Sequence, residues 1–173
     1  MKQKQTMRNG VLVKSLALMA AALLALPSSG QGLVDLTSPT GGTITYSASL
    51  SPYLGTKAFD DGSLTDSNSR WLANKSTLPN SWVQFQFNEG AKVVNAYRVY
   101  GLTSYDYATR DPKDFQLEGS NDGTNWTLLD SQSNQTSWGD HEARFFEFTN
   151  RTPYSYYKFT ITANNGASDY TGV

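Results

Sequence analysis

Strict alternation of apolar and polar residues is the feature that most limits how this chain can fold. Residues 83–87 read VQFQF and residues 156–162 read YYKFTIT, so every second residue is apolar. Successive side chains of a strand point to opposite faces, and a period of two therefore predicts strands with one buried face. Three further stretches show the same spacing: Tyr97 with Val99, Phe115 with Leu117, and Phe146 with Phe148. Such antiparallel strands, separated by turns, predict an all-β fold, either a sandwich or a barrel.

The first 30 residues have the order of a secretory signal peptide. Four basic residues precede an apolar stretch at 15–26, and small or helix-breaking residues follow at 27–30. Twelve such residues are too few for a membrane anchor, because a spanning helix needs about 20. We therefore expect cleavage near Gly30, a lead-in segment at 31–42, one domain at 43–173 and no transmembrane segment in the mature chain. This places the protein outside the cell or on its surface, with the periplasm as an alternative.

Charge and cysteine content exclude several functions. Without residues 1–30 the chain keeps ten Lys and Arg against 15 Asp and Glu, a net charge of about −5. Nucleic acids and anionic membranes attract basic surfaces, so neither is expected as a partner. The chain has no Cys and one His, which excludes a cysteine nucleophile, a Cys-type zinc site and a multi-His metal cluster. Its core must hold without disulfides.

The stretch GSNDGTNWTLLD at 119–130 has two possible explanations, a calcium loop or a hairpin turn. An EF-hand register that puts Gly123 at position six gives Glu118 at position one and Leu129 at position twelve. Those positions require Asp and a bidentate Glu, so the calcium loop fails. Asn121-Asp122-Gly123 suits a tight turn because these residues tolerate positive φ. We expect a hairpin in which Trp126 and Leu128 point inward.

Five segments, in the same order, resemble the discoidin family, also called the factor V/VIII type C domain. Its bacterial sugar-binding branch is carbohydrate-binding module family 32. The segments are KAFDDGSLTDSNSRWLA (57–73), LPNSWVQFQF (78–87), VVNAYRVYG (93–101), RDPKDFQLEGSNDGTNWTLLD (110–130) and YSYYKFTITANNG (154–166). The resemblance implies an antiparallel β-sandwich, a discoidin-like jelly roll, with Trp71, Trp82 and Trp126 as framework residues of the core. Family members usually continue into one more strand that carries a Glu, and this sequence ends at Val173, so we expect that last strand to be absent.

The resemblance also implies one structural calcium ion beside the early Asp-Gly loop. Calcium takes six to eight oxygen ligands. Matched to the family's motif, the ligands are Asp60 or Asp61, Ser69 and the carbonyl of Lys57. The alternative is an acidic turn that only meets water.

Aromatic residues in polar loops are the candidate ligand-binding residues. Sugar recognition combines an aromatic face with a few polar groups that bind hydroxyls. The residues that suit this chemistry are Tyr53, Tyr105, Tyr107, Trp138 and His141. For each of them ordinary loop packing is the alternative. Arg110 is expected to anchor its loop to a carboxylate.

These observations predict a monomeric, non-catalytic domain that binds a glycan or glycoconjugate. One alternative is an adhesion module of the same fold that binds a protein. The other is a β-sandwich polysaccharide lyase, in which a Tyr or His acts as the base and an Arg neutralises a uronate. Tyr105, Tyr107, Arg110 and His141 supply those residue types.

Overall fold

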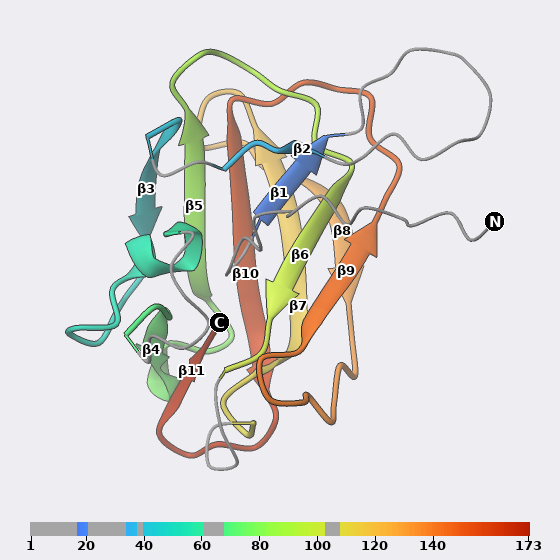
Figure 1. Cartoon of the computed structure of the whole chain (residues 1–173). Helices are drawn as coiled ribbons and strands as arrows, with labels where there is room; N and C mark the ends of the chain where they lie inside the picture. The colour runs from blue at the N-terminus through green and yellow to red at the C-terminus, as the bar shows by residue number, and fades with distance from the viewer. Residues whose placement is uncertain (1–16, 21–33, 38–39, 61–67, 103–107) are drawn as a thin grey trace, which may run out of the picture.

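The computed structural model describes residues 17–20, 34–37, 40–60, 68–102 and 108–173. They form short strands and two 3-10 helices (Figure 1). In chain order these are β1 (Ala17–Ala20), β2 (Val34–Asp35), β3 (Gly42–Tyr46), η1 (Gly55–Phe59), β4 (Leu72–Asn74), η2 (Lys75–Thr77), β5 (Ser81–Phe87), β6 (Ala96–Tyr100), β7 (Pro112–Ser120), β8 (Thr127–Gln132), β9 (Ala143–Glu147), β10 (Tyr156–Asn164) and β11 (Tyr170–Gly172).

The strands make a sandwich of two antiparallel sheets. The larger sheet has the order β3-β5-β10-β7-β8 and the smaller one β2-β1-β6-β9, while β11 pairs with β4 in a separate two-stranded ribbon. Figure 1 shows the smaller sheet lying across the larger one. This confirms the all-β fold that the alternation predicts and the antiparallel β-sandwich that the family resemblance implies. Within the segment predicted to be a signal peptide, residues 17–20 pair with both β2 and β6.

Alternation places the core where the sequence predicts it. Val83, Phe85 and Phe87 of β5 are buried, and Tyr157, Phe159 and Ile161 of β10 lie beside them. Tyr97 of β6 joins the two sheets, because its ring lies 5.1 Å from Phe146 in its own sheet and 6.3–6.4 Å from two rings of the larger sheet, Phe115 and Phe159. The Tyr97 hydroxyl donates to Asp130 at 2.6 Å. An aromatic cluster therefore holds the sandwich together without disulfides.

The hairpin at 119–130 is confirmed. Gly123 has φ +72°, and the Asp122 carboxylate accepts hydrogen bonds from the backbone N–H groups of Thr124 and Asn125. A hydrogen bond from the Asn125 side-chain amide, together with these two backbone bonds, holds the pKa of Asp122 well below its ordinary value. Asp122 thus caps the turn.

The predicted direction of Trp126 and Leu128 is wrong. Leu128 is 55 % exposed, and Trp126 lies against Lys158, whose Nζ is 4.1 Å from the ring centre. The cause is a register shift in the β7–β8 ladder, where Leu117 pairs with Asp130 but Glu118 pairs with Leu128. The residue passed over, Leu129, packs against the core instead. Trp82 also lies half-buried on the outer side, and of the three framework tryptophans Trp71 is the one inside the core.

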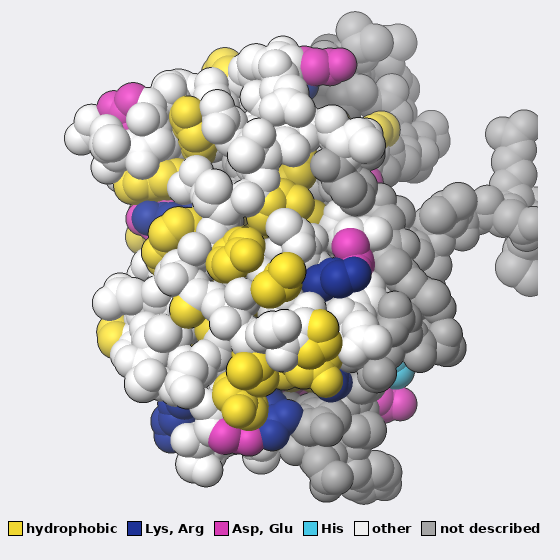
Figure 2. Space-filling model, turned by 90° about the vertical axis from the view of Figure 1, so that its left-hand side faces the viewer, with side chains coloured by type: hydrophobic (Ala, Val, Ile, Leu, Met, Phe, Trp, Pro, Cys, Tyr) yellow, Lys and Arg dark blue, Asp and Glu magenta, His cyan; other side chains and the backbone are white. Residues whose placement is uncertain are grey.

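β3 is one of the two edge strands of the larger sheet and carries no charged residue. Figure 2 shows hydrophobic side chains running down this side of the molecule. The η1 helix packs against part of β3, with Gly55 so close to Tyr46 that a Cβ there would collide with the ring. An uncovered edge invites pairing with another chain, and η1 limits that access. No helix of the described residues is long and apolar enough to span a membrane.

Truncation of the core should be costly. We expect Phe115→Ala to lower the free energy of unfolding by about 3–5 kcal/mol, because the ring is fully buried between both sheets. Leu128→Ala serves as the control and should change it by about 0.5 kcal/mol or less, since that side chain faces water. Urea unfolding measures both, and equal losses would contradict the assigned core.

Candidate functional site

Four connections meet at one end of the sandwich, the lower end in Figure 1. They follow β3, β6, β8 and β10, and backbone hydrogen bonds tie the last three to one another. Ala167 N–H donates to Thr109 O at 3.0 Å, and Gly101 N–H donates to Glu142 O at 2.8 Å. The connection after β3 is held to the strand that follows it, because Leu72 N–H donates to Tyr53 O at 3.1 Å. This loop end contains every described residue that the sequence nominates for ligand or metal binding. Tyr105, Tyr107 and Asp61 lie outside the described residues.

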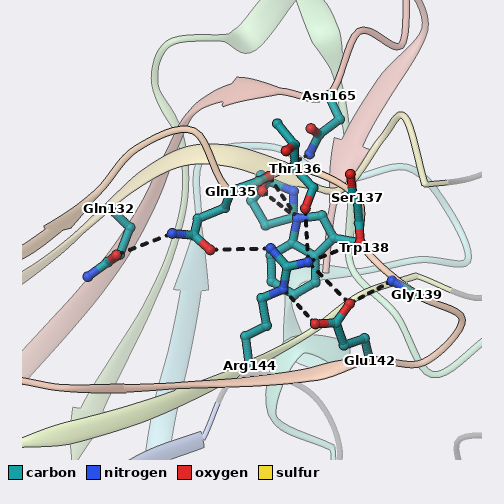
Figure 3. A network of polar contacts seen from close by, with 10 residues as sticks. Gln132, Gln135, Thr136, Ser137, Trp138, Gly139, Glu142, Arg144 and Asn165 are labelled. Carbon is teal, nitrogen blue, oxygen red and sulfur yellow. Dashed lines mark hydrogen bonds and ion pairs between the residues drawn. The ribbon is translucent and has the colours of Figure 1, made fainter.

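Trp138 is not an exposed platform. Its side chain is buried, 5 % exposed, and its indole N–H donates to Pro112 O at 2.9 Å and to Gln135 O at 3.1 Å. The guanidinium of Arg144 lies over the ring at 4.1 Å (Figure 3). The prediction that Trp138 offers a free stacking face is therefore corrected: a polar loop sequence does not imply an exposed ring, and here the indole anchors the loop.

Arg144 fastens the 133–142 loop from within (Figure 3). Its Nε donates to Glu142 Oε1 at 2.8 Å, and its Nη2 donates to the carbonyls of Thr136 and Ser137 at 2.9 and 3.1 Å. Glu142 also accepts the Gly139 N–H at 2.7 Å, and hydrogen bonds from Arg144 and from that N–H lower the Glu142 pKa. The planar fork of an arginine suits such a site, and it leaves Arg144 engaged with the loop rather than with a ligand.

This fastening holds unusual backbone angles. Asn134, Ser137 and His141 have φ of 56°, 58° and 53°. Positive φ is uncommon for residues other than glycine and costs energy that neighbouring contacts must offset. The loop thereby places His141 and Asp140 at the surface of the loop end, called the rim below, where their side chains are 27 % and 66 % exposed. His141 Nε2 lies 3.8 Å from Asp140 Oδ1.

Tyr53 sits in the first loop with one face covered. The Arg70 guanidinium lies 4.4 Å from its ring centre, and Arg70 is buried while Tyr53 is half-buried. A buried cation against the ring fixes its orientation. The ring of Tyr53 thus keeps a defined position at the loop end.

Arg110 behaves as the sequence predicts. Its guanidinium binds the Asp169 carboxylate through two N–H groups, one of them Nε at 3.1 Å, and lies 5.1 Å from the Tyr170 ring centre. The hydrogen bond from Arg110 lowers the pKa of Asp169. The arginine of the lyase alternative is thus already paired with a carboxylate.

The predicted metal ligands Asp60, Ser69 and Lys57 do come together. Ser69 Oγ donates to Asp60 Oδ1 at 2.6 Å, and Lys57 Nζ lies 3.3 Å from Asp60 Oδ2. The sequence predicts the Lys57 carbonyl as a metal ligand, whereas in the structure Lys57 contacts Asp60 through its ammonium group. A calcium ion needs several oxygens, and an ammonium on one of them competes for the same charge. Within the described ranges, no group of three or more His, Cys, Asp or Glu residues surrounds a common point.

Asp111 lies beneath the loops and is fully buried. Its Oδ1 accepts the Leu102 N–H at 2.7 Å, which closes the base of the 101–111 loop, while its Oδ2 has no hydrogen-bond partner. Burial raises the pKa of Asp111 to about 8, against the lowering effect of the Leu102 N–H and Arg144; Glu142 adds to the rise. Asp111 is therefore largely protonated at neutral pH.

The sequence does not single out the clamp formed by Arg144 and Glu142, or the Arg70 contact. The sequence holds one signal for Arg144, because its spacing puts it on the same strand face as Phe146 and Phe148. In the structure Arg144 pairs with the core residue Val99. A charged residue on the inward face of a strand requires a buried partner. Arg70 and Asp111 lie in irregular segments, where no periodicity predicts burial.

The architecture is that of a β-sandwich module whose loops gather at one end. A family model described as "F5/8 type C domain" matches residues 43–173, and the chain belongs to this family. No significant match exists among curated proteins.

Solved structures share the fold. The family 32 carbohydrate-binding module of Clostridium perfringens NanJ, in complex with galactose, has a TM-score of 0.60 and 13 % identity, covering 79 % of this chain and 91 % of that one. CpGH89CBM32-5 from Clostridium perfringens, in complex with GalNAc-β-1,3-galactose, has a TM-score of 0.58 and 14 % identity, and the match covers 79 % of this chain and 93 % of that one. Chitosan-binding module 1 from a Paenibacillus sp. IK-5 chitosanase/glucanase has a TM-score of 0.57 and 22 % identity, and the match covers 76 % of this chain and 89 % of that one. At these identities the likeness establishes the fold.

The buried acid gives a pH prediction. Because the folded-state pKa of Asp111 lies above its ordinary value of 3.8, the folded protein retains a proton that the unfolded chain releases. The contribution of Asp111 to the free energy of unfolding should therefore fall as pH rises from about 4 to about 8, by at most about 1.4 kcal/mol per pH unit. Asp111→Asn imitates the protonated form and should remove this part of the slope. Urea unfolding at pH 4, 6 and 8 measures it, and parallel pH profiles for both proteins would overturn the assignment.

Proposed function

We propose that the chain is a monomeric, non-catalytic glycan-binding domain that works outside the cell or on its surface. The observation that carries the proposal is the loop end, where a strained and clamped loop turns His141 and Asp140 to the rim and Arg70 orients Tyr53. Two modules of the same fold were solved with galactose or GalNAc-β-1,3-galactose bound, which supports a sugar as the ligand.

The chemistry of the rim suits an uncharged sugar. A tyrosine ring can pack on the C–H side of a pyranose, while an imidazole and a carboxylate bind hydroxyl groups. Preorganisation strengthens such a site, since side chains that are already ordered lose little freedom when a ligand arrives. The pairing of Arg110 with Asp169 argues against the lyase alternative, which needs a cation for its substrate.

Two substitutions test the sugar site. We expect Tyr53→Ala and His141→Ala each to weaken galactose binding at least about tenfold, or about 1.4 kcal/mol, measured by calorimetry. Tyr53→Phe keeps the ring and should bind as the unchanged protein does. Phe145→Ala is the matched control, because Phe145 is an exposed aromatic residue on the outer face of the smaller sheet. No binding of galactose or any arrayed glycan at millimolar concentration would sink the proposal, and capture of a protein ligand instead would favour the adhesion alternative.

We also propose that any calcium bound beside η1 competes with the Lys57 ammonium for Asp60, the pair being 3.3 Å apart. Removing the competing charge in Lys57→Met should raise calcium affinity and the calcium-dependent gain in melting temperature. Calorimetric titration with calcium chloride, with Lys75→Met as a control for loss of a surface lysine, measures the effect. Equal affinities in all three proteins would show that Lys57 does not compete.

A further inference from the structure

The outer face of the larger sheet has an unusual composition. Side chains opposite the core form rows across the strands, and one row runs Thr45, Gln84, Lys158, Glu118, Leu128 in paired register. Lys158 Nζ lies 3.0 Å from Glu118 Oε2, so the two charges of this row cancel. Asp114 stands at one end of β7, where its carboxylate accepts the Asn134 N–H at 2.7 Å. Most of the remaining positions carry uncharged amides and hydroxyls.

Three aromatic side chains share this face. Trp82 pairs with Thr160 in the row next to Lys158, and Tyr156 pairs with Gln86 in the row on the other side. Trp126 reaches the face from the start of β8 and contacts Lys158. All three are half-buried, so each ring keeps some surface in contact with water. These three rings are not part of the hydrophobic core. Large aromatic side chains that stay partly exposed on a sheet face are typical of binding surfaces.

The charge pattern selects the kind of partner. Nucleic acid, an acidic polysaccharide or an anionic membrane needs an excess of positive charge, and the Lys158–Glu118 pair provides none. An uncharged, hydroxyl-rich polymer suits amides, hydroxyls and exposed ring faces.

This face continues into the loop end. Trp82 N–H donates to Ser47 Oγ at 2.9 Å, and Ser47 Oγ donates to Trp82 O at 3.3 Å. Ser47 opens the connection that carries Tyr53. A chain held at the loop end thus has an adjoining surface along which it can extend.

We propose that the outer face of the larger sheet is a second glycan-binding surface, which takes the extended part of a neutral polysaccharide across Trp82, Gln84 and Tyr156. It rests on the proposed function of the loop end and adds the substrate class, a polymer rather than a terminal sugar. The loop end would bind one or two sugar units, and the sheet face would supply the additional affinity for a longer chain by raising the effective concentration of its neighbouring units.

The test compares one polymer with one monosaccharide. Affinity electrophoresis in gels containing neutral galactan measures polymer binding, calorimetry with galactose measures the loop end, and gels containing alginate test a charged polymer. We expect Trp82→Ala, Tyr156→Ala and Gln84→Ala to weaken galactan binding at least about fivefold while galactose binding stays unchanged. Tyr53→Ala should weaken both, and Phe145→Ala neither. Trp82→Phe retains a ring and should restore most of the retardation, which separates a ring contact from misfolding.

The outcomes separate the two proposals. Galactan retardation that is absent, or unchanged in the Trp82→Ala and Tyr156→Ala double variant, overturns the sheet surface even if galactose binds. Equal losses for galactose and galactan also overturn it, because they place all binding at the loop end. Stronger retardation by alginate than by galactan contradicts the neutral-polymer assignment. Absence of galactose binding together with the predicted galactan losses would instead overturn the loop-end site and leave the sheet face standing.

Discussion

The contact on which the rest of the structure depends is the aromatic packing around Tyr97. Its ring meets aromatic residues of its own sheet and of the opposite sheet: Phe115, Phe146, Phe148 and Phe159. Burial and the bond to Asp130 raise its pKa above the ordinary range, so the hydroxyl stays neutral and donates. With no cysteine in the chain, this dispersion-rich contact is what fixes the distance between the sheets, and hence the positions of the strand ends from which the loops start.

The loop end adds a second level of order. Trp138 and Arg144 join the 133–142 loop to the body of the domain, Arg110 joins the final ribbon, and Asp111 closes the loop that follows β6. The contacts of Trp138 and Arg110 reach a strand or connection other than their own, whereas Asp111 joins the two ends of one connection. Within the described residues, these contacts order parts of the loop end before any ligand arrives, and such preorganisation favours binding.

Periodicity predicts the larger part of the fold. The rows of Val83 and Phe159 lie where a period of two puts them, and the Asn-Asp-Gly turn follows from local backbone preferences. Prediction fails at Leu128 because one skipped residue in a ladder reverses the alternation, and no local pattern signals a bulge. It fails at Trp138 because burial in a loop depends on partners far away in sequence, here Pro112 and Arg144. Of the metal ligands, the nearness of Asp60 and Ser69 follows from the family resemblance, whereas the ammonium contact of Lys57 depends on a rotamer that sequence does not specify.

The internal clamp of the 133–142 loop bears on how this domain can change its specificity. Arg144 of β9 binds the carbonyls of Thr136 and Ser137 and the carboxylate of Glu142, so these contacts hold the backbone path without using the side chain of Asp140. Exposed positions such as Asp140 can then be exchanged while the path is retained. The anchoring residues of the loop and its exposed residues are thus separate sets. A library that varies the exposed residues and keeps Arg144, Glu142 and Trp138 is a rational route to new ligand preferences on an unchanged sandwich.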